Sequence, residues 1–185
     1  MIWIILGLAI WYGAHLLKRW APNQRAAMTE RMGDASKGVI AGALALSIFF
    51  FWLGYRQAEV VPLWYFPWAV HLNNLLMIIA VILFGLGSSK SRFRSKMRHP
   101  MLTGFAVWAF AHLLVNGDLA SLVMFGGLLV WAIIEIPVIN RAEPDYVPYE
   151  GGSVAGDIRL LIISLVVFSV IAGLHMLLGP WPFPS

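Results

Sequence analysis

The sequence lacks cysteine and has few charged residues. Without cysteine, disulfides, thiolate zinc sites, iron–sulfur ligation, covalent haem attachment and cysteine nucleophiles are all excluded. Charged residues make up 12% of the 185-residue chain and hydrophobic residues 60%, against about 25% charged residues in an ordinary soluble domain. A chain of this size cannot bury so much apolar surface in a water-soluble core. We therefore expect an all-α membrane protein with one domain over residues 1–185.

Six hydrophobic segments have about the length of a membrane-spanning helix. They cover residues 2–17, 39–54, 66–86, 101–115, 119–138 and 158–178. The first and fourth are short for a span, which needs about 17 to 25 residues. We expect the first helix to continue toward Trp20 and the fourth to begin near His99. The predicted fold class is a polytopic helical bundle of six transmembrane helices.

Lysine and arginine are concentrated in alternate loops. The loops after the first, third and fifth segments carry Lys18, Arg19, Arg25, Arg31, Lys37, Lys90, Arg92, Arg94, Lys96, Arg98 and Arg141, with Arg159 at the far edge. The other two loops carry only Arg56. Cytoplasmic loops have an excess of basic residues, so this pattern predicts that both termini are extracytoplasmic. The net charge of +4 then reflects topology, and no nucleic-acid partner is expected. No cleaved signal peptide is expected, because the positive charge follows the first apolar run.

The five histidines fall into two layers along the predicted spans. His71, His112 and His175 lie in the outer half of the bilayer, and His15 and His99 lie in the inner half. Ionisable residues inside a membrane are costly and indicate function. His15, His71 and His175 are near span ends, where interfacial water also explains an imidazole. His112 lies among apolar residues and is the leading functional candidate.

Imidazole side chains point to iron or copper as the metal to consider. Two imidazoles on facing helices can hold a haem inside a helix bundle, and haem is large and apolar enough for such an interior. Composition alone does not select haem, because apolar faces of membrane helices usually serve packing.

A second polar group precedes the fourth segment, in Arg98-His99-Pro100. Proline is common at the first turn of a helix, and the basic residues before it fit the cytoplasmic side. The functional alternative is anion capture at the helix N-terminus, with Glu135 as a candidate partner of Arg98 or His99. Binding of anionic lipid headgroups by the basic loop is a further alternative.

One long stretch has a specific family resemblance. The run from Arg98-His99-Pro100 through Trp108-Ala109-Phe110-Ala111-His112 to Asn116-Gly117-Asp118, together with His15, resembles the NnrU family of bacterial membrane proteins associated with denitrification. The resemblance implies the bacterial inner membrane and a role in nitrite and nitric oxide metabolism. That family is similar to the plant 15-cis-zeta-carotene isomerase, which uses b-type haem.

The resemblance implies a non-covalent haem b held by His15 and His112, with His99 as a further functional histidine. The two ligands fall in different layers, so the haem would have to be tilted, or the first span would have to sit deeper. The alternative pair within one layer is His71 with His112. Redox or isomerase-like chemistry on a hydrophobic small molecule would follow, and an oligomer is compatible with the sequence.

Two other functions remain open. The Arg98-His99-Pro100 motif also resembles isoprenylcysteine methyltransferases and related lipid methyltransferases, where it helps to hold S-adenosylmethionine. The later acidic element of those enzymes is weak here, because Glu135 stands alone before Pro137. The third alternative is a non-catalytic accessory or transport subunit of the membrane.

Overall fold

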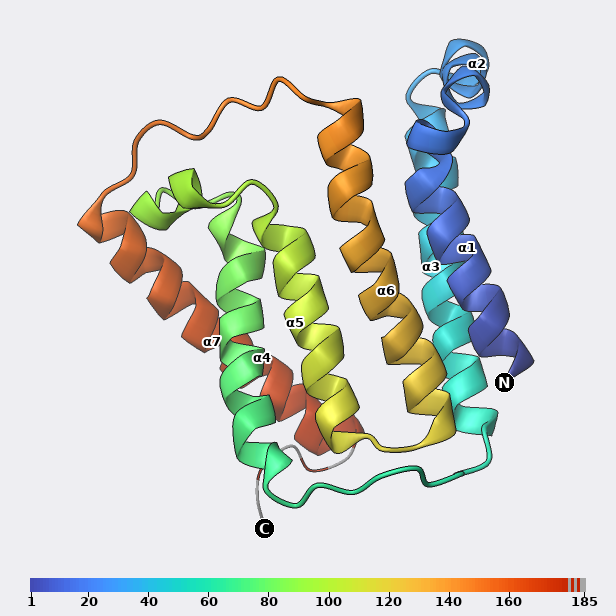
Figure 1. Ribbon diagram of the computed structural model, residues 1–185, viewed down its shortest axis with the longest axis vertical. Helices are drawn as coiled ribbons and strands as arrows, with labels where there is room; N and C mark the ends of the chain where they lie inside the picture. Colours follow the sequence, from blue (N-terminus) through green and yellow to red (C-terminus); the bar gives the residue numbers. More distant parts are fainter. Residues whose placement is uncertain (180, 182, 184–185) are drawn as a thin grey trace.

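The computed structural model describes residues 1–179, 181 and 183. The described residues form seven α-helices and one short 3-10 helix, and they contain no β-strand (Figure 1). The helices are α1 (Ile2–Trp20), α2 (Pro22–Met32), α3 (Ala35–Gln57), α4 (Ala69–Leu86), η1 (Arg92–Lys96), α5 (Pro100–Val115), α6 (Leu119–Ala142) and α7 (Val154–Leu178). The prediction of an all-helical fold is confirmed.

Each of the six hydrophobic segments is helical. Four helices, α3, α4, α6 and α7, are long and apolar enough to cross a membrane by length and composition. The fifth, α5, is apolar but has only 16 residues, and α1 has 19 residues and ends on Lys18, Arg19 and Trp20. As expected, α1 extends to Trp20, and α5 begins directly after His99 with Pro100 in its first turn. The protein therefore has several helices suited to a lipid bilayer.

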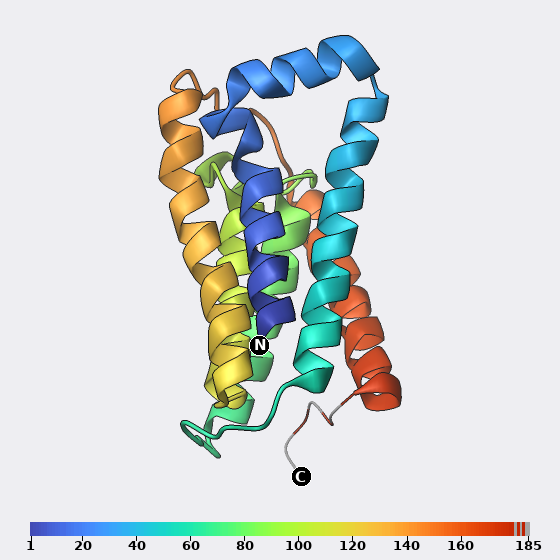
Figure 2. The same cartoon turned by 90° about the vertical axis from the view of Figure 1, so that its right-hand side faces the viewer.

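The helix α2 was not expected from the sequence. It has no buried residue, and Figure 2 shows it lying across the ends of α1 and α3. Pro22 begins it, where a missing backbone N–H is tolerated. Gly33 then reverses the chain with a φ of 56°, which glycine adopts without steric cost. Because α2 has polar residues on every side, it lacks the apolar stripe that usually reveals a helix.

The helices form a bundle with two distinct ends. α1 packs against α3 and α6, α5 lies between α6 and α4, and α7 crosses α4 obliquely. We call the end that carries α2 and η1 the basic end, and the end where α1 begins and α7 ends the terminus end (Figure 1). α1 and α3 approach closely, because a Cβ on Gly54 would lie 2.8 Å from the Ile4 backbone nitrogen.

At the basic end, the loop carrying η1 is fixed to the start of α7. The Asp157 carboxylate accepts hydrogen bonds from the Ser91 hydroxyl at 2.7 Å and from the Arg92 backbone N–H at 2.9 Å. It also pairs with the Arg92 guanidinium at 2.7 Å. Ser153 caps α7 by accepting the Gly156 N–H at 3.0 Å. These contacts hold α7 against the bundle although a long extended segment separates it from α6.

At the terminus end, the loop between α3 and α4 is fixed to the turn between α5 and α6. The backbone N–H groups of Leu63 and Trp64 donate to the Gly117 carbonyl at 2.7 and 3.1 Å. Asp118 caps α6 by accepting the Ser121 N–H at 2.9 Å, an interaction typical of helix N-termini. The long loop of residues 58–68 therefore follows the underside of the bundle.

Candidate functional site

A continuous cluster of aromatic rings joins α1, α5 and α6. We call it the aromatic seam. Neighbouring ring centroids in it lie between 4.4 and 5.6 Å apart, within the range of favourable aromatic contact. Its members are Trp11 and His15 from α1, Phe105, Trp108 and His112 from α5, and Phe125 and Trp131 from α6. His15 and His112, two of the predicted ligand histidines, thus belong to the same aromatic cluster.

His112 is held on one side by its own helix and on the other by α6. Its ring stacks on Phe125 with a centroid distance of 4.7 Å and an interplanar angle of 30°. Its Nδ1 lies 2.9 Å from the Trp108 carbonyl oxygen. A carbonyl oxygen only accepts, so Nδ1 carries the proton and the lone pair of Nε2 stays available. This is the arrangement in which a histidine binds a metal through Nε2.

His15 repeats the same local arrangement on α1. Its Nδ1–H donates to the Trp11 carbonyl oxygen at 2.9 Å, and its ring lies 4.4 Å from Trp11 and 4.5 Å from Trp131. The Nε2 atom of His15 is therefore also unprotonated in the neutral ring. Both histidines follow a tryptophan by four residues, and both point into the same seam.

The two histidines lie at different heights in the bundle, as their predicted layers require. His15 contacts Trp131 and His112 contacts Phe125, which are six residues apart on α6 and thus offset by about 9 Å along its axis. Phe105 and Trp108 lie between them in the seam. Among the residues described, no three histidine, aspartate or glutamate side chains converge as a metal site. The seam thus offers two separate imidazole positions.

Of the other predicted residues, His71 does not join the seam. It is exposed near the start of α4, so its ring faces the surroundings of the bundle. Asn73, two residues further along α4, is buried, and its side-chain N–H donates to the Asn74 side-chain oxygen at 3.2 Å. The structure therefore brings His15 and His112 into one cluster and leaves His71 outside it.

Arg98 and His99 make contacts within the basic end. The Arg98 guanidinium donates to the Glu143 backbone carbonyl and lies 4.9 Å from the centre of the Tyr146 ring. His99 Nε2 lies 2.8 Å from the Asn140 side-chain oxygen. The suggested pairing of either residue with Glu135 is wrong in this structure, because the end of α6 and the following loop supply their partners. These contacts fasten α5 to α6.

Glu135 is a buried acid in the last third of α6. It is 6% exposed, and its Oε2 has no hydrogen-bond partner among the described residues. The indole N–H groups of Trp11 and Trp131, both in the seam, are also buried without a partner. Buried polar atoms normally have hydrogen-bond partners. The interior near His15 thus holds three unpaired polar atoms.

At the cytoplasm-facing edge predicted by the charges, Glu143 joins α6 to α1. Its carboxylate lies 2.8 Å from the Arg19 guanidinium and 3.6 Å from the Lys18 ammonium group. The positive charge of Arg19 is the main influence that lowers the pKa of Glu143, and Lys18 acts in the same direction. A lowered carboxyl pKa means that the pairing stabilises the protein above the ordinary glutamate pKa and is lost on acidification.

We expect Glu143→Gln to be slightly less stable than the wild type at neutral pH. The difference should disappear as the pH falls through the lowered pKa of Glu143, where the carboxylate becomes protonated in the folded protein. The difference should shrink in high salt, because exposed ion pairs are screened. Thermal unfolding of detergent-solubilised protein across pH and salt checks this. A stability difference that persists unchanged in acid would contradict it.

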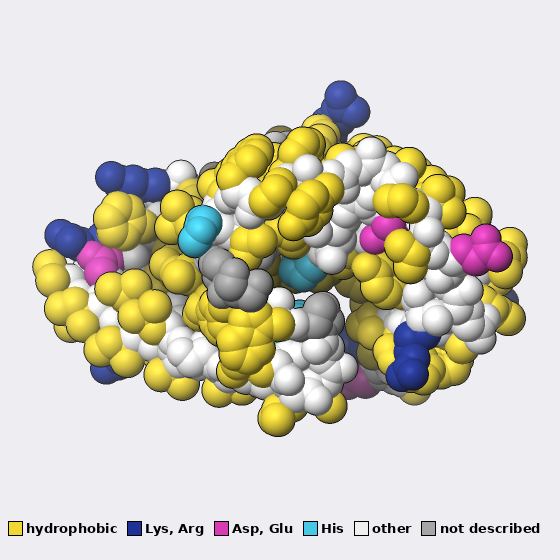
Figure 3. Space-filling view, turned by 90° about the horizontal axis from the view of Figure 1, so that it is seen from below, with side chains coloured by type: hydrophobic (Ala, Val, Ile, Leu, Met, Phe, Trp, Pro, Cys, Tyr) yellow, Lys and Arg dark blue, Asp and Glu magenta, His cyan; other side chains and the backbone are white. Residues whose placement is uncertain are grey.

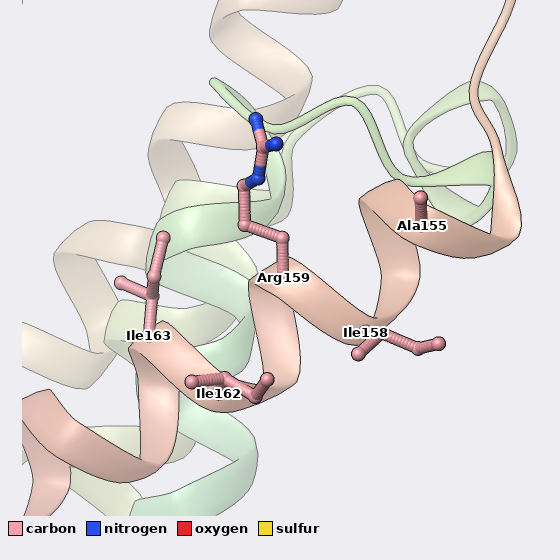
Figure 4. Close-up of a pocket in the computed structure, with 5 residues that line it drawn as sticks. All are labelled: Ala155, Ile158, Arg159, Ile162 and Ile163. Atoms are coloured by element: carbon pink, nitrogen blue, oxygen red, sulfur yellow. The ribbon is translucent and has the colours of Figure 1, made fainter.

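Arg159 is exposed on the surface of α7. Figure 4 shows it in a shallow hollow with Ala155, Ile158, Ile162 and Ile163, its side chain extending toward the loop that carries η1. A long cationic side chain can keep its stem on an apolar surface while its charge reaches a polar boundary. Arg159 therefore reaches toward the basic end, where most of the other basic residues lie.

The sequence did not single out the aromatic members of the seam. Trp11, Phe105 and Trp131 are common types in any membrane helix, so composition alone gave them no functional meaning. One signal was available in the repeated spacing of Trp11 to His15 and Trp108 to His112. Residues four apart lie on the same face of a helix, so each tryptophan supports its histidine.

The fold and the seam define a class, a polytopic helical membrane protein with histidines in an aromatic interior. The comparison with family models gives the family. The chain belongs to the NnrU family, whose model, described as NnrU protein, matches residues 3–182. No curated protein and no solved structure matched the chain.

Proposed function

We propose that this NnrU-family protein binds one b-type haem non-covalently in the aromatic seam. The observation that carries the proposal is the fixed orientation of His112, whose Nδ1–H donates to the Trp108 carbonyl at 2.9 Å and so leaves Nε2 as a ligand. Aromatic rings around the imidazole suit a flat apolar macrocycle. His15 is the second proposed ligand, because it has the same orientation in the same seam. For both histidines to hold one group, the rings of Phe105 and Trp108 that lie between them would have to move aside.

The residues fit the cofactor in type. Neutral imidazole is a common axial ligand of haem iron, and Trp11, Phe105 and Trp131 supply an apolar wall. The unpaired indole N–H groups of Trp11 and Trp131 can donate to a polar edge of the bound group. Haem in such a place would supply redox chemistry or binding of a small ligand such as nitric oxide. The chain's own residues would orient the group and keep water away from it.

The proposed role is support of nitrite and nitric oxide metabolism in the bacterial inner membrane, by redox or isomerase-like chemistry. The family membership supports this role. S-adenosylmethionine would be held by the side chains of Arg98 and His99. In this structure both side chains are engaged within the protein, Arg98 with Glu143 and Tyr146 and His99 with Asn140. The geometry therefore favours haem binding over methyl transfer.

The direct experiment is a visible absorption spectrum of the full-length protein, purified in detergent from cells supplied with a haem precursor. We expect a Soret band, and separate α and β bands after reduction. Nitric oxide added to the reduced protein should shift these bands. A protein that stays colourless after purification, and also after incubation with haemin, would overturn the proposal.

We also propose six membrane-spanning helices, α1 and α3 to α7, with both termini outside the cytoplasm. The alternation of basic loops, and the position of the start of α1 and the end of α7 at one end of the bundle, support this topology. A reporter fused at either terminus should be extracytoplasmic, and one inserted between Ser88 and Ser95 should be cytoplasmic. Opposite signals from the two kinds of fusion would reverse the orientation. Equal signals from the termini and the loop would exclude three spans on each side of the loop, and different signals from the two termini would exclude an even number of spans.

A further inference from the structure

A separate cavity of about 380 Å³ lies between α4, α5 and α7. Aliphatic side chains of α4 and α7 form most of its wall, and the Trp108 indole forms the side nearest the seam. Ser164 and His175, both on α7, are its two polar side chains other than the indole N–H. This volume and composition are typical of a site for a small apolar ligand with few polar contacts.

The cavity is long and narrow. The residues of α7 that line it recur at helical spacing along one face of the helix. They are Leu160, Ile163, Ser164, Val167, Ile171 and His175. Fifteen residues separate the first from the last, which is about 22 Å along the helix axis. A space of this shape matches one extended hydrocarbon chain better than a rigid flat ring system.

Ser164 places a polar atom in the middle of this wall. The residue is 2% exposed, and a Cβ built on Gly85 of α4 would lie 3.9 Å from its hydroxyl oxygen. The Ser164 residue lines the cavity, and a hydroxyl group both donates and accepts hydrogen bonds. It can therefore pair with a polar atom of an occupant.

His175 marks the outer end of the cavity. Its Nδ1–H donates to the Ile171 carbonyl at 3.1 Å, so Nε2 of the neutral ring is an acceptor. The residue is exposed and lies near the terminus end of α7, the end seen in Figure 3, where histidine side chains show between the helices. A ligand recognised there must donate a hydrogen bond. No lysine or arginine lines the cavity, so an anionic phosphate is disfavoured.

We propose that the cavity between α4, α5 and α7 binds a neutral single-chain lipid alcohol that enters from the bilayer. Its hydrocarbon chain lies along α7, and its hydroxyl group donates a hydrogen bond to His175 Nε2. A polar atom along the chain, where the lipid has one, pairs with Ser164. The site borders the seam at Trp108, and the proposal does not depend on haem.

The test uses the full-length protein in phosphatidylcholine nanodiscs, with a long-chain alcohol that carries a photoreactive diazirine in mid-chain. After illumination, labelled peptides are identified by mass spectrometry. We expect labels within residues 77–85 and 160–175, and about a tenfold loss of label when unlabelled alcohol is added in large excess. Labels spread evenly over all lipid-facing helices, with no competition, would show ordinary boundary lipid and overturn the proposal.

Two adjacent valines of α7 provide a matched pair of variants. Val167 lines the cavity, whereas Val166 does not, and both are exposed at 41% and 58%. Val167→Trp should fill the space and lower labelling about tenfold, while Val166→Trp should leave it unchanged. Because both side chains lie on the surface, neither substitution should prevent folding. Equal labelling of the two variants would overturn the proposed position.

His175→Ala tests recognition of the head. It should lower labelling by the alcohol several-fold without changing labelling by the matching diazirine alkane, which has no hydroxyl group. If both probes respond equally, His175 shapes the cavity without binding the hydroxyl group, and the proposed ligand class is wrong. Haem spectra recorded on the same samples test the seam independently, so failure of the cavity proposal can be distinguished from failure of the haem proposal.

Discussion

Replacement of His112 by alanine should abolish haem binding or convert its spectrum from six-coordinate low spin toward five-coordinate. The reason is that no other imidazole contacts Phe125, where His112 stacks at 4.7 Å. The nearby indole rings offer no lone pair to iron. Where haem is lost, occupancy should fall at least about tenfold, which corresponds to about 1.4 kcal/mol of binding free energy. Absorbance per protein, before and after reduction, measures it.

Three further variants make this result specific. His112→Gly should regain a haem spectrum when free imidazole is added, because the ligand is then supplied from solution. His15→Ala should alter the spectrum with a change in coordination, whereas His71→Ala should leave it intact, since His71 is exposed outside the seam. A haem-loaded protein whose spectrum survives both His112→Ala and His15→Ala would show that these histidines only pack in the core.

Replacement of Gly156 by alanine should destabilise the protein by about 3 kcal/mol or more. A Cβ at this position would lie 1.9 Å from the Lys90 carbonyl oxygen. That carbonyl belongs to backbone and is held in place by the Ser153 N–H, which donates to it at 3.1 Å. Relief of the clash would move the start of α7 away from the loop and break the Asp157 contacts. Thermal unfolding of the protein in detergent measures the loss.

Gly173 in the same helix is the matched control. A Cβ there would meet no atom within 4 Å, and alanine is the better helix former by about 1 kcal/mol. Gly173→Ala should therefore be neutral or slightly stabilising. If both variants unfold at the wild-type temperature, the close approach of α7 to residue 90 is absent in the folded protein.

Sequence patterns within single segments were sufficient to predict the helices, but not to predict which side chains of different helices contact one another. The segment at 101–115 was predicted as a helix from hydropathy and from Pro100, and it is α5. Glu135 was predicted to meet Arg98 or His99, because all three lie at similar depth. Depth does not fix the rotation of each helix about its axis, and the structure turns Arg98 toward Glu143 and His99 toward Asn140.

The sequence by itself determined that this is an apolar helical membrane protein of the NnrU family, with basic loops in alternation and His112 inside an apolar segment. Those features depend on composition and spacing within a single helix, which sequence displays directly. Only the tertiary structure decided that His15 and His112 share one aromatic seam and that His71 lies outside it. Such contacts depend on how α1, α5 and α6 rotate and pack against one another, and each is set by side chains far apart in the chain.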